Sequence, residues 1–268
     1  MAPAVMGVLN VTPDSFSDGG RWLDPAAAVA HGRAMVAAGA AVVDVGGEST
    51  RPGASPVAPE EERRRVLPVV EALAGVVRVS IDTRHAEVAE SAIDAGATLV
   101  NDVSASLWPV VAAAGPRVGW VAMHMRGEPP TMQREPAYDD VVAEVRAFLL
   151  DRARQAAEAG VGEVWIDPGI GFGKTAGHNL ALLRHLDALV GHGFGVVVGT
   201  SRKSFLGRLA PGADGQPAAV NDREEASLAT AAWAMVQGAG MIRCHEVAPA
   251  VRAARLVASG GGSGGGPR

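Results

Sequence analysis

The apolar positions of this chain fall into short, β-branched runs at fairly even intervals, and an alanine-rich stretch of helical period follows each run. The runs are apolar almost without interruption, as expected of parallel strands that are covered on both faces. This alternation predicts a parallel sheet covered by helices. The predicted strands are residues 5–11, 41–47, 77–83, 98–104, 118–125, 164–169, 195–201 and 241–245.

The segments between these runs carry helix start and stop signals. Asp24 and Pro25 precede a predicted helix over residues 26–38, and Pro59 with the two glutamates after it precedes one over residues 62–73. The glycines at positions 39, 96, 160 and 238 are expected to end helices. Strand–helix units that repeat eight times in roughly 250 residues predict an α/β fold, the (β/α)8 or TIM barrel, in a single domain.

An open, doubly wound sheet is the alternative that the same pattern allows. That fold usually carries a G-x-G-x-x-G motif after its first strand, and none follows Val11. The pattern therefore favours the closed barrel. We expect the barrel to occupy residues 1–258 and the glycine-rich segment 259–268 to form a flexible tail, because such a segment cannot join a packed core.

Charge and cysteine usage narrow the class of protein. The 268 residues carry a formal net charge of -5 and the lysines and arginines are scattered, which argues against nucleic acid and anionic membranes as partners. No run of about 20 apolar residues occurs. Cys244 is the single cysteine and is expected to be packed in a strand, so an intramolecular disulfide is impossible. These features predict a soluble, cytoplasmic protein.

Charged and amide side chains gather at the predicted C-terminal end of every strand, the face on which barrel enzymes carry their chemistry. Asp, Asn and Thr after a strand can also cap the next helix, so both interpretations stay open for Asp102 and Glu48. Lysine and arginine are not such caps, and an apolar barrel mouth would disfavour them unless a polar or anionic ligand binds there. The residues concerned are Asn10, Glu48, Thr50, Arg51, Asp82, Asn101, Asp102, His124, Asp167, Ser201, Arg202, Lys203, Arg243 and His245.

Motif spacing tests two further kinds of site, for nucleotides and for metals. The glycine-rich segment 167–175 (DPGIGFGKT) lacks the glycine that a phosphate-binding loop needs at position 168, where proline stands, so nucleotide hydrolysis is not predicted. The histidines lack the spacing of a zinc set. Asn10, with Asp14 and Asp18 nearby, offers oxygen ligands suited to a loosely held Mg²⁺.

Two motifs in the N-terminal part of the chain carry a family resemblance. Residues 6–20 (MGVLNVTPDSFSDGG) and 45–53 (VGGESTRPG) resemble the two signatures of the dihydropteroate synthases. The likeness continues through residues 80–83, 100–103, 123–127, 166–173, 199–205 and 243–245, and so covers nearly the whole chain up to the tail.

The resemblance implies a transferase of folate biosynthesis with a pterin-binding TIM barrel. Such an enzyme condenses 6-hydroxymethyl-7,8-dihydropterin pyrophosphate with p-aminobenzoate, giving 7,8-dihydropteroate and pyrophosphate. It also implies a Mg²⁺ cofactor, inhibition by sulfonamides, and a homodimer built through barrel helices.

The family's functional residues map onto the matching positions of this chain. The resemblance places the pterin against Asp82, Asn101, Val103, Met125, Asp167, Phe172, Lys203 and Arg243, with Asp167 fixing its orientation. It gives catalytic roles to Asp82, Lys203, Arg243 and His245, and metal binding to Asn10. It assigns p-aminobenzoate to Phe16, Thr50, Arg51, Pro52 and Ser201.

Two alternatives share parts of this pattern. The pterin-binding domain of cobalamin-dependent methyltransferases is similar in fold, but it lacks the pairing of residues 50–52 (TRP) with 201–203 (SRK). A catalytically inactive paralogue that only binds a pterin is the other, and no signature residue has been lost that would favour it. Residues 104–109 (SASLWP) depart from the glycine-rich sequence common in the family, which affects only the expected shape of that loop.

Overall fold

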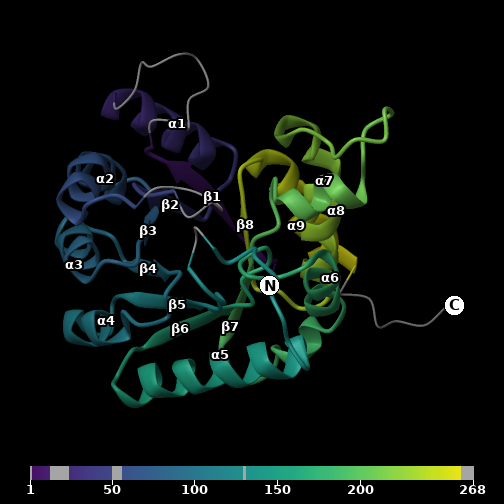
Figure 1. Cartoon of the computed structure of the whole chain (residues 1–268). Coiled ribbons are helices and arrows are strands. Elements are labelled where there is room, and N and C mark those ends of the chain that lie inside the picture. The colour runs from purple at the N-terminus through teal and green to yellow at the C-terminus, as the bar shows by residue number, and fades with distance from the viewer. Residues whose placement is uncertain (1, 13–23, 50–55, 129–130, 261–268) are drawn as a thin grey trace, which may run out of the picture.

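Eight parallel strands form a closed barrel in the computed structural model, which describes residues 2–12, 24–49, 56–128 and 131–260 (Figure 1). Each strand pairs with the next along the chain, and β8 closes the barrel against β1. The predicted single-domain TIM barrel is therefore confirmed. The strands are β1 (Ala4–Asn10), β2 (Val42–Gly46), β3 (Arg78–Asp82), β4 (Leu99–Asp102), β5 (Gly119–Met123), β6 (Glu163–Asp167), β7 (Gly195–Val198) and β8 (Met241–Cys244).

Helices surround the barrel on the outside (Figure 1). They are α1 (Pro25–Ala37), α2 (Pro59–Ala74), α3 (Ala86–Asp94), α4 (Trp108–Ala114), α5 (Val141–Glu158), α6 (Ala176–Arg184), α7 (Ser204–Leu209), α8 (Glu224–Val236) and α9 (Val247–Gly260). Short 3-10 turns lie at η1 (Leu186–Ala188) and η2 (Val220–Asp222). The connection from β7 to β8 thus carries two helices, α7 and α8.

The helix boundaries follow the predicted start and stop signals. Asp24 caps α1 by accepting a hydrogen bond from the Ala26 N–H at 3.0 Å. α2 begins at Pro59, earlier than predicted, because proline fits the first turn of a helix, where an N–H has no intrahelical partner. The glycines that were expected to end helices all have positive φ angles: Gly39, Gly96, Gly160 and Gly238.

α9 extends to Gly260, into the segment predicted as a tail, and residues 261–268 lie outside the described part of the chain. The division into a barrel over 1–258 and a flexible tail stays a prediction. Among the helices of the described residues, none has the length and apolarity that crossing a membrane requires.

The core has two parts, one between strands and helices and one inside the barrel. The inner part is a separate buried cluster made by Met6, Val42, Leu99, Val121, Val197 and Met241. In a β-strand, residues two apart point to the same face. The side chains two positions further along β2, β4 and β8 therefore also point into the barrel, nearer its C-terminal mouth. They are Asp44, Asn101 and Arg243.

Candidate active site

Arg243 is the centre of a hydrogen-bonded network at the C-terminal mouth of the barrel. Its Nε donates to Asp44 Oδ2 at 2.7 Å, and its Nη2 donates to Asp82 Oδ2 at 2.6 Å. The Asn101 amide donates to the same Asp44 oxygen at 3.0 Å. Four strands thus contribute one side chain each, and the network brings together three of the predicted pterin-site residues.

Asp44 is the member of this network that the sequence analysis missed. It is fully buried in β2, between Val43 and Val45. A carboxylate inside an otherwise apolar strand is costly unless it is paired, so its presence was the available signal. Its role here is to hold Arg243 and Asn101 in fixed orientations.

Burial and neighbouring charges perturb the ionisable groups of the mouth. Burial raises the pKa of Asp82 to about 7, against the opposing effect of Arg243. Burial also lowers the pKa of Lys203 to about 8, and Asp167 opposes this change. For Arg243 the carboxylates of Asp44 and Asp82 outweigh burial, and its pKa is raised. Clustered, strongly perturbed groups in a barrel mouth are typical of a functional site.

Asp167 ends β6 and is buried, with 4% of its surface exposed. Its Oδ1 accepts a hydrogen bond from the Gly169 N–H at 2.7 Å, which leaves Oδ2 for a ligand. Burial raises the pKa of Asp167, while Lys203 nearby lowers it. The carboxylate is therefore fixed in orientation and sits beside a cation.

Lys203 immediately precedes α7. Its ammonium group donates to the Ile170 carbonyl and lies 4.7 Å from the centroid of the Phe172 ring. Lys203 thus joins the seventh strand end to the glycine-rich loop after β6. This brings the predicted residues Asp167, Phe172 and Lys203 together.

Lys174 is a buried lysine that the sequence analysis did not single out. It is 1% exposed and donates to His124 Nδ1 at 2.9 Å, and it also donates to the backbone carbonyls of His124 and Phe172. Burial lowers the pKa of Lys174 to about 7 and that of His124 to about 3. His124, one of the polar strand-end residues, therefore holds the loop after β6 through Lys174. Nothing in the local sequence distinguishes Lys174 from an exposed lysine.

Ser201 and His245 lie against each other at the ends of β7 and β8. The Ser201 hydroxyl and His245 Nδ1 are 2.9 Å apart, and the His245 N–H donates to Ser201 Oγ at 3.2 Å. Arg202, next to Ser201 in the chain, forms an ion pair with Glu246. Among the described residues, Arg202 is thus a strand-end cation that does not join the hydrogen-bonded network of Arg243.

The two undecided carboxylates have different surroundings. Asp102 is a loop anchor, because it accepts hydrogen bonds from the Ser106 and Leu107 N–H groups, from Trp120 Nε1 and from both polar groups of Ser104. These bonds give residues 104–109 their shape. Glu48 accepts a hydrogen bond from the backbone of the segment before α2 and lies near Arg84 and His85.

The remaining predicted pterin contacts are Val103, which is buried, and Met125, which is half-buried, after β4 and β5 respectively. The predictions for Phe16, Thr50, Arg51 and Pro52, and for the metal-site neighbours Asp14 and Asp18, lie outside the described residues.

Asn10 ends β1 and is half-buried. Gly46 in the neighbouring strand has no Cβ. A Cβ placed on Gly46 would lie 3.7 Å from Asn10 Oδ1 and 3.7 Å from Asp82 Oδ2, so these two oxygens line the space that it leaves. Asp82 Oδ1 is buried and accepts no hydrogen bond. Mg²⁺ takes one or two protein oxygens together with substrate phosphates, so an oxygen-lined recess of this kind fits it.

These features define a barrel enzyme whose mouth binds a polar ligand through carboxylate, amide and cationic groups. The family model of pterin binding enzymes matches residues 6–245, and the chain belongs to that family. A protein of Mycobacterium leprae named dihydropteroate synthase is 52% identical over 96% of this chain and 93% of its own length. Within the family, the chain belongs to the dihydropteroate synthases.

Solved structures agree with this assignment. A Yersinia pestis dihydropteroate synthase in complex with a sulfonamide drug has a TM-score of 0.90 and 40% identity, over 98% of this chain and 95% of that one. A Xanthomonas albilineans dihydropteroate synthase with 4-aminobenzoic acid has a TM-score of 0.88 and 42% identity, over 98% and 94%. Another structure of the latter enzyme is a complex with 7,8-dihydropteroate.

Proposed function

We propose that this protein condenses 6-hydroxymethyl-7,8-dihydropterin pyrophosphate with p-aminobenzoate, forming 7,8-dihydropteroate and releasing pyrophosphate. The observation that carries the proposal is the cluster of Asp82, Asn101, Asp167, Lys203 and Arg243 at one barrel mouth, in a chain that is 52% identical to a dihydropteroate synthase. The cluster supplies the chemistry that each substrate needs.

The pterin ring offers N–H donors beside acceptors on its amino-pyrimidinone edge. Asp167 is suited to accept bonds from that edge, because the Gly169 N–H holds one carboxylate oxygen and so fixes the orientation of the group. Charge-assisted bonds of this kind are roughly twice as strong as neutral ones. Asn101 and Lys203 supply the amide and the cation that complete the recognition, while Val103, Met125 and Phe172 line the flat faces of the ring.

In the reaction, the bond between the pterin methylene carbon and pyrophosphate breaks, and the aromatic amine forms a new C–N bond to that carbon before losing a proton to solvent. We infer that pyrophosphate departs before the amine attacks, so positive charge develops on the pterin. Asp82 stabilises this charge, and Arg243 with His245 neutralises the departing anion. Asp44 positions Arg243 for this task.

Mg²⁺ is the proposed cofactor, and Asn10 is the residue that would hold it. When bound, the ion supplies electrostatic stabilisation to the pyrophosphate leaving group. The chain's own part is the space beside Gly46, around which Asn10 Oδ1 and Asp82 Oδ2 both lie.

For p-aminobenzoate, we propose that Ser201 contacts the carboxylate while Phe16 and Pro52, with the stem of Lys203, form the slot for the ring. Thr50 and Arg51 are also proposed to contact p-aminobenzoate. A homodimer and a cytoplasmic location complete the proposal.

The p-aminobenzoate site can be tested with a sulfonamide, which presents the same aniline on a planar ring. We expect a sulfonamide to inhibit dihydropteroate formation, and excess p-aminobenzoate to restore the rate, as measured by product chromatography over a matrix of both concentrations. Inhibition that excess p-aminobenzoate cannot relieve would show that the drug and the amine do not share a site.

A further inference from the structure

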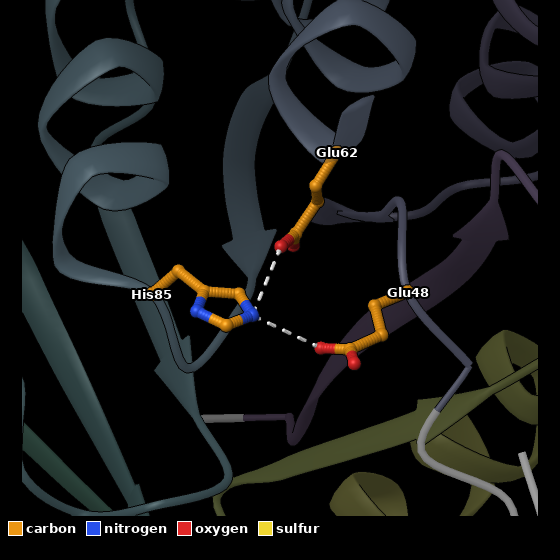
Figure 2. A group of neighbouring side chains, drawn as sticks. All are labelled: Glu48, Glu62 and His85. Atoms are coloured by element: carbon orange, nitrogen blue, oxygen red, sulfur yellow. Dashed lines mark ion pairs between the residues drawn. The ribbon is translucent and has the colours of Figure 1, made fainter. Parts of the chain in front are cut away.

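Three side chains that do not belong to the Arg243 network converge from three different elements. Glu48 follows β2, Glu62 lies in the first half of α2, and His85 immediately precedes α3 (Figure 2). His85 Nε2 lies 3.4 Å from Glu48 Oε2 and 3.8 Å from Glu62 Oε2. One ligand atom from each residue falls within 4.8 Å of the other two.

Glu62 is the most unusual member of this group. Its side chain is 0% exposed, and neither of its carboxylate oxygens lies within hydrogen-bonding geometry of a partner. His85 Nε2, which faces it, is also buried without a hydrogen bond. The Glu62 carboxylate and His85 Nε2 approach each other only to 3.8 Å, which is beyond hydrogen-bonding distance, so a cation bound between them would offset the cost of burying both groups.

We propose that Glu48, Glu62 and His85 form a binding site for a Zn²⁺-class divalent transition-metal ion. Zinc binds His nitrogen and carboxylate oxygen at about 2.0–2.2 Å, which in a tetrahedral site places neighbouring ligand atoms roughly 3.3–3.6 Å apart. The two separations from His85 Nε2, 3.4 and 3.8 Å, approach this spacing, and all three ligand atoms lie within 4.8 Å of one another. Water would supply the fourth ligand.

The surroundings orient Glu48. Glu48 Oε1 accepts a hydrogen bond from the Val57 N–H at 3.2 Å, so that Oε2 faces His85 (Figure 2).

Arg84 is the positive charge next to the site, since its Nε lies 3.4 Å from Glu48 Oε2. It also pairs with Glu128 through Nη1 at 3.2 Å, and this pair can be kept when a metal takes the Glu48 oxygen. Two carboxylates, a neutral imidazole and a divalent ion sum to no net charge, so the bound site would not repel Arg84.

The imidazole decides which metal fits. Mg²⁺ prefers an octahedral set of oxygens and loses its water reluctantly, whereas Zn²⁺ and its first-row neighbours readily take a mixed nitrogen and oxygen set. The site is therefore distinct in chemistry from the Mg²⁺ position proposed at Asn10. Its metal would tie the end of β2, α2 and the start of α3 together and so stabilise the folded chain by mass action.

Isothermal titration calorimetry of the full chain with Zn²⁺ alone tests the site. We expect the wild type to bind one more equivalent of Zn²⁺ than either His85→Ala or Glu62→Gln. The control variant His31→Ala, on the exposed face of α1, should bind as much Zn²⁺ as the wild type. Excess Mg²⁺ should not displace the Zn²⁺ bound at this site. Far-UV circular dichroism checks that each variant is folded.

Co²⁺ in place of Zn²⁺ gives a second readout that does not depend on turnover. A four-coordinate site with one imidazole should produce visible absorption bands that are present in the wild type and in His31→Ala and absent in His85→Ala. Equal Zn²⁺ uptake by the wild type and His85→Ala, or wild-type binding no tighter than millimolar, would overturn the proposal whether or not the enzyme is active.

Discussion

At the scale of single residues, the barrel mouth is built from charges that stability alone does not explain. Replacing a buried ion pair by well-packed apolar residues is often neutral or stabilising, whereas removing one partner is costly. Asp44, Asp82 and Arg243 therefore serve orientation, because together they fix a guanidinium, a carboxylate and, through Asp44, the Asn101 amide. We propose that this network and Asp167 bind the pterin.

The Asp167 carboxylate is predicted to supply charge-assisted bonds to the pterin edge. Asp167→Asn should weaken pterin binding roughly tenfold or more, because hydrogen bonds to charged groups contribute about 1.5–3 kcal/mol and asparagine accepts only neutral ones. Calorimetric titration with the dihydropterin pyrophosphate measures this. Asp94→Asn, on the exposed side of α3, is the matched control and should bind normally.

Arg51 is expected to act after pterin binding, so Arg51→Ala should impair turnover while leaving pterin affinity nearly intact. The same titration, run beside a rate measurement, separates the two roles. An equal loss of pterin affinity in Asp167→Asn and Arg51→Ala would contradict this division.

At the scale of elements, the loop between β6 and α6 is the part that positions the site most directly. Gly169 has a φ of 62°, and a Cβ on it would lie 1.8 Å from the His124 carbonyl oxygen. Lys174 fastens the other end of the loop to the same residue. The backbone of the loop therefore holds Asp167 and Phe172 in place. No residue with a side chain fits at Gly169, where the loop contacts His124 just after β5.

Gly169→Ala tests this account of the loop. The added methyl would force the backbone away from His124, so we expect lost pterin affinity and a lowered thermal midpoint, measured by calorimetric titration and differential scanning calorimetry. Gly177→Ala lies in α6, where a Cβ meets only Thr175 Oγ1 at 3.8 Å, and it should keep affinity and raise stability by about 0.5–1 kcal/mol. Similar behaviour of the two variants would show that the loop does not depend on its backbone.

The fold could be predicted because its signals are local in the sequence. Strand and helix alternation is written in hydrophobic pattern, and capping residues such as Asp24 and Pro59 are local signals. The strand-end rule then brought Asp82, Asn101 and Arg243 to one face. Asp44 and Lys174 were not predicted as site residues, because their burial depends on residues distant in sequence, such as Arg243 and His124.

At the scale of the whole molecule, the buried lysine makes stability depend on pH. The pKa of Lys174 is about 7 in the folded chain and about 10.4 when unfolded, so between these values the unfolded chain binds more protons. The free energy of unfolding should therefore rise from pH 7 to 9. Above pH 9 the raised pKa of Cys244 opposes this trend.

Lys174→Met removes the titrating group and should flatten this rise by up to about 1.4 kcal/mol per pH unit, as measured by urea unfolding at several pH values. Lys203 leaves a smaller rise in both proteins. Arg154→Met, exposed on α5, should keep the wild-type slope. Parallel stability profiles for the wild type and Lys174→Met would mean that Lys174 keeps its charge when folded.

The most direct test of the central claim is pyrophosphate release by the purified protein, supplied with 6-hydroxymethyl-7,8-dihydropterin pyrophosphate and Mg²⁺, with and without p-aminobenzoate. The account predicts release that requires the amine and yields dihydropteroate in equal amount. Tight pterin binding by calorimetry with no amine-dependent release would contradict it, and would identify the chain as a pterin-binding protein without synthase activity.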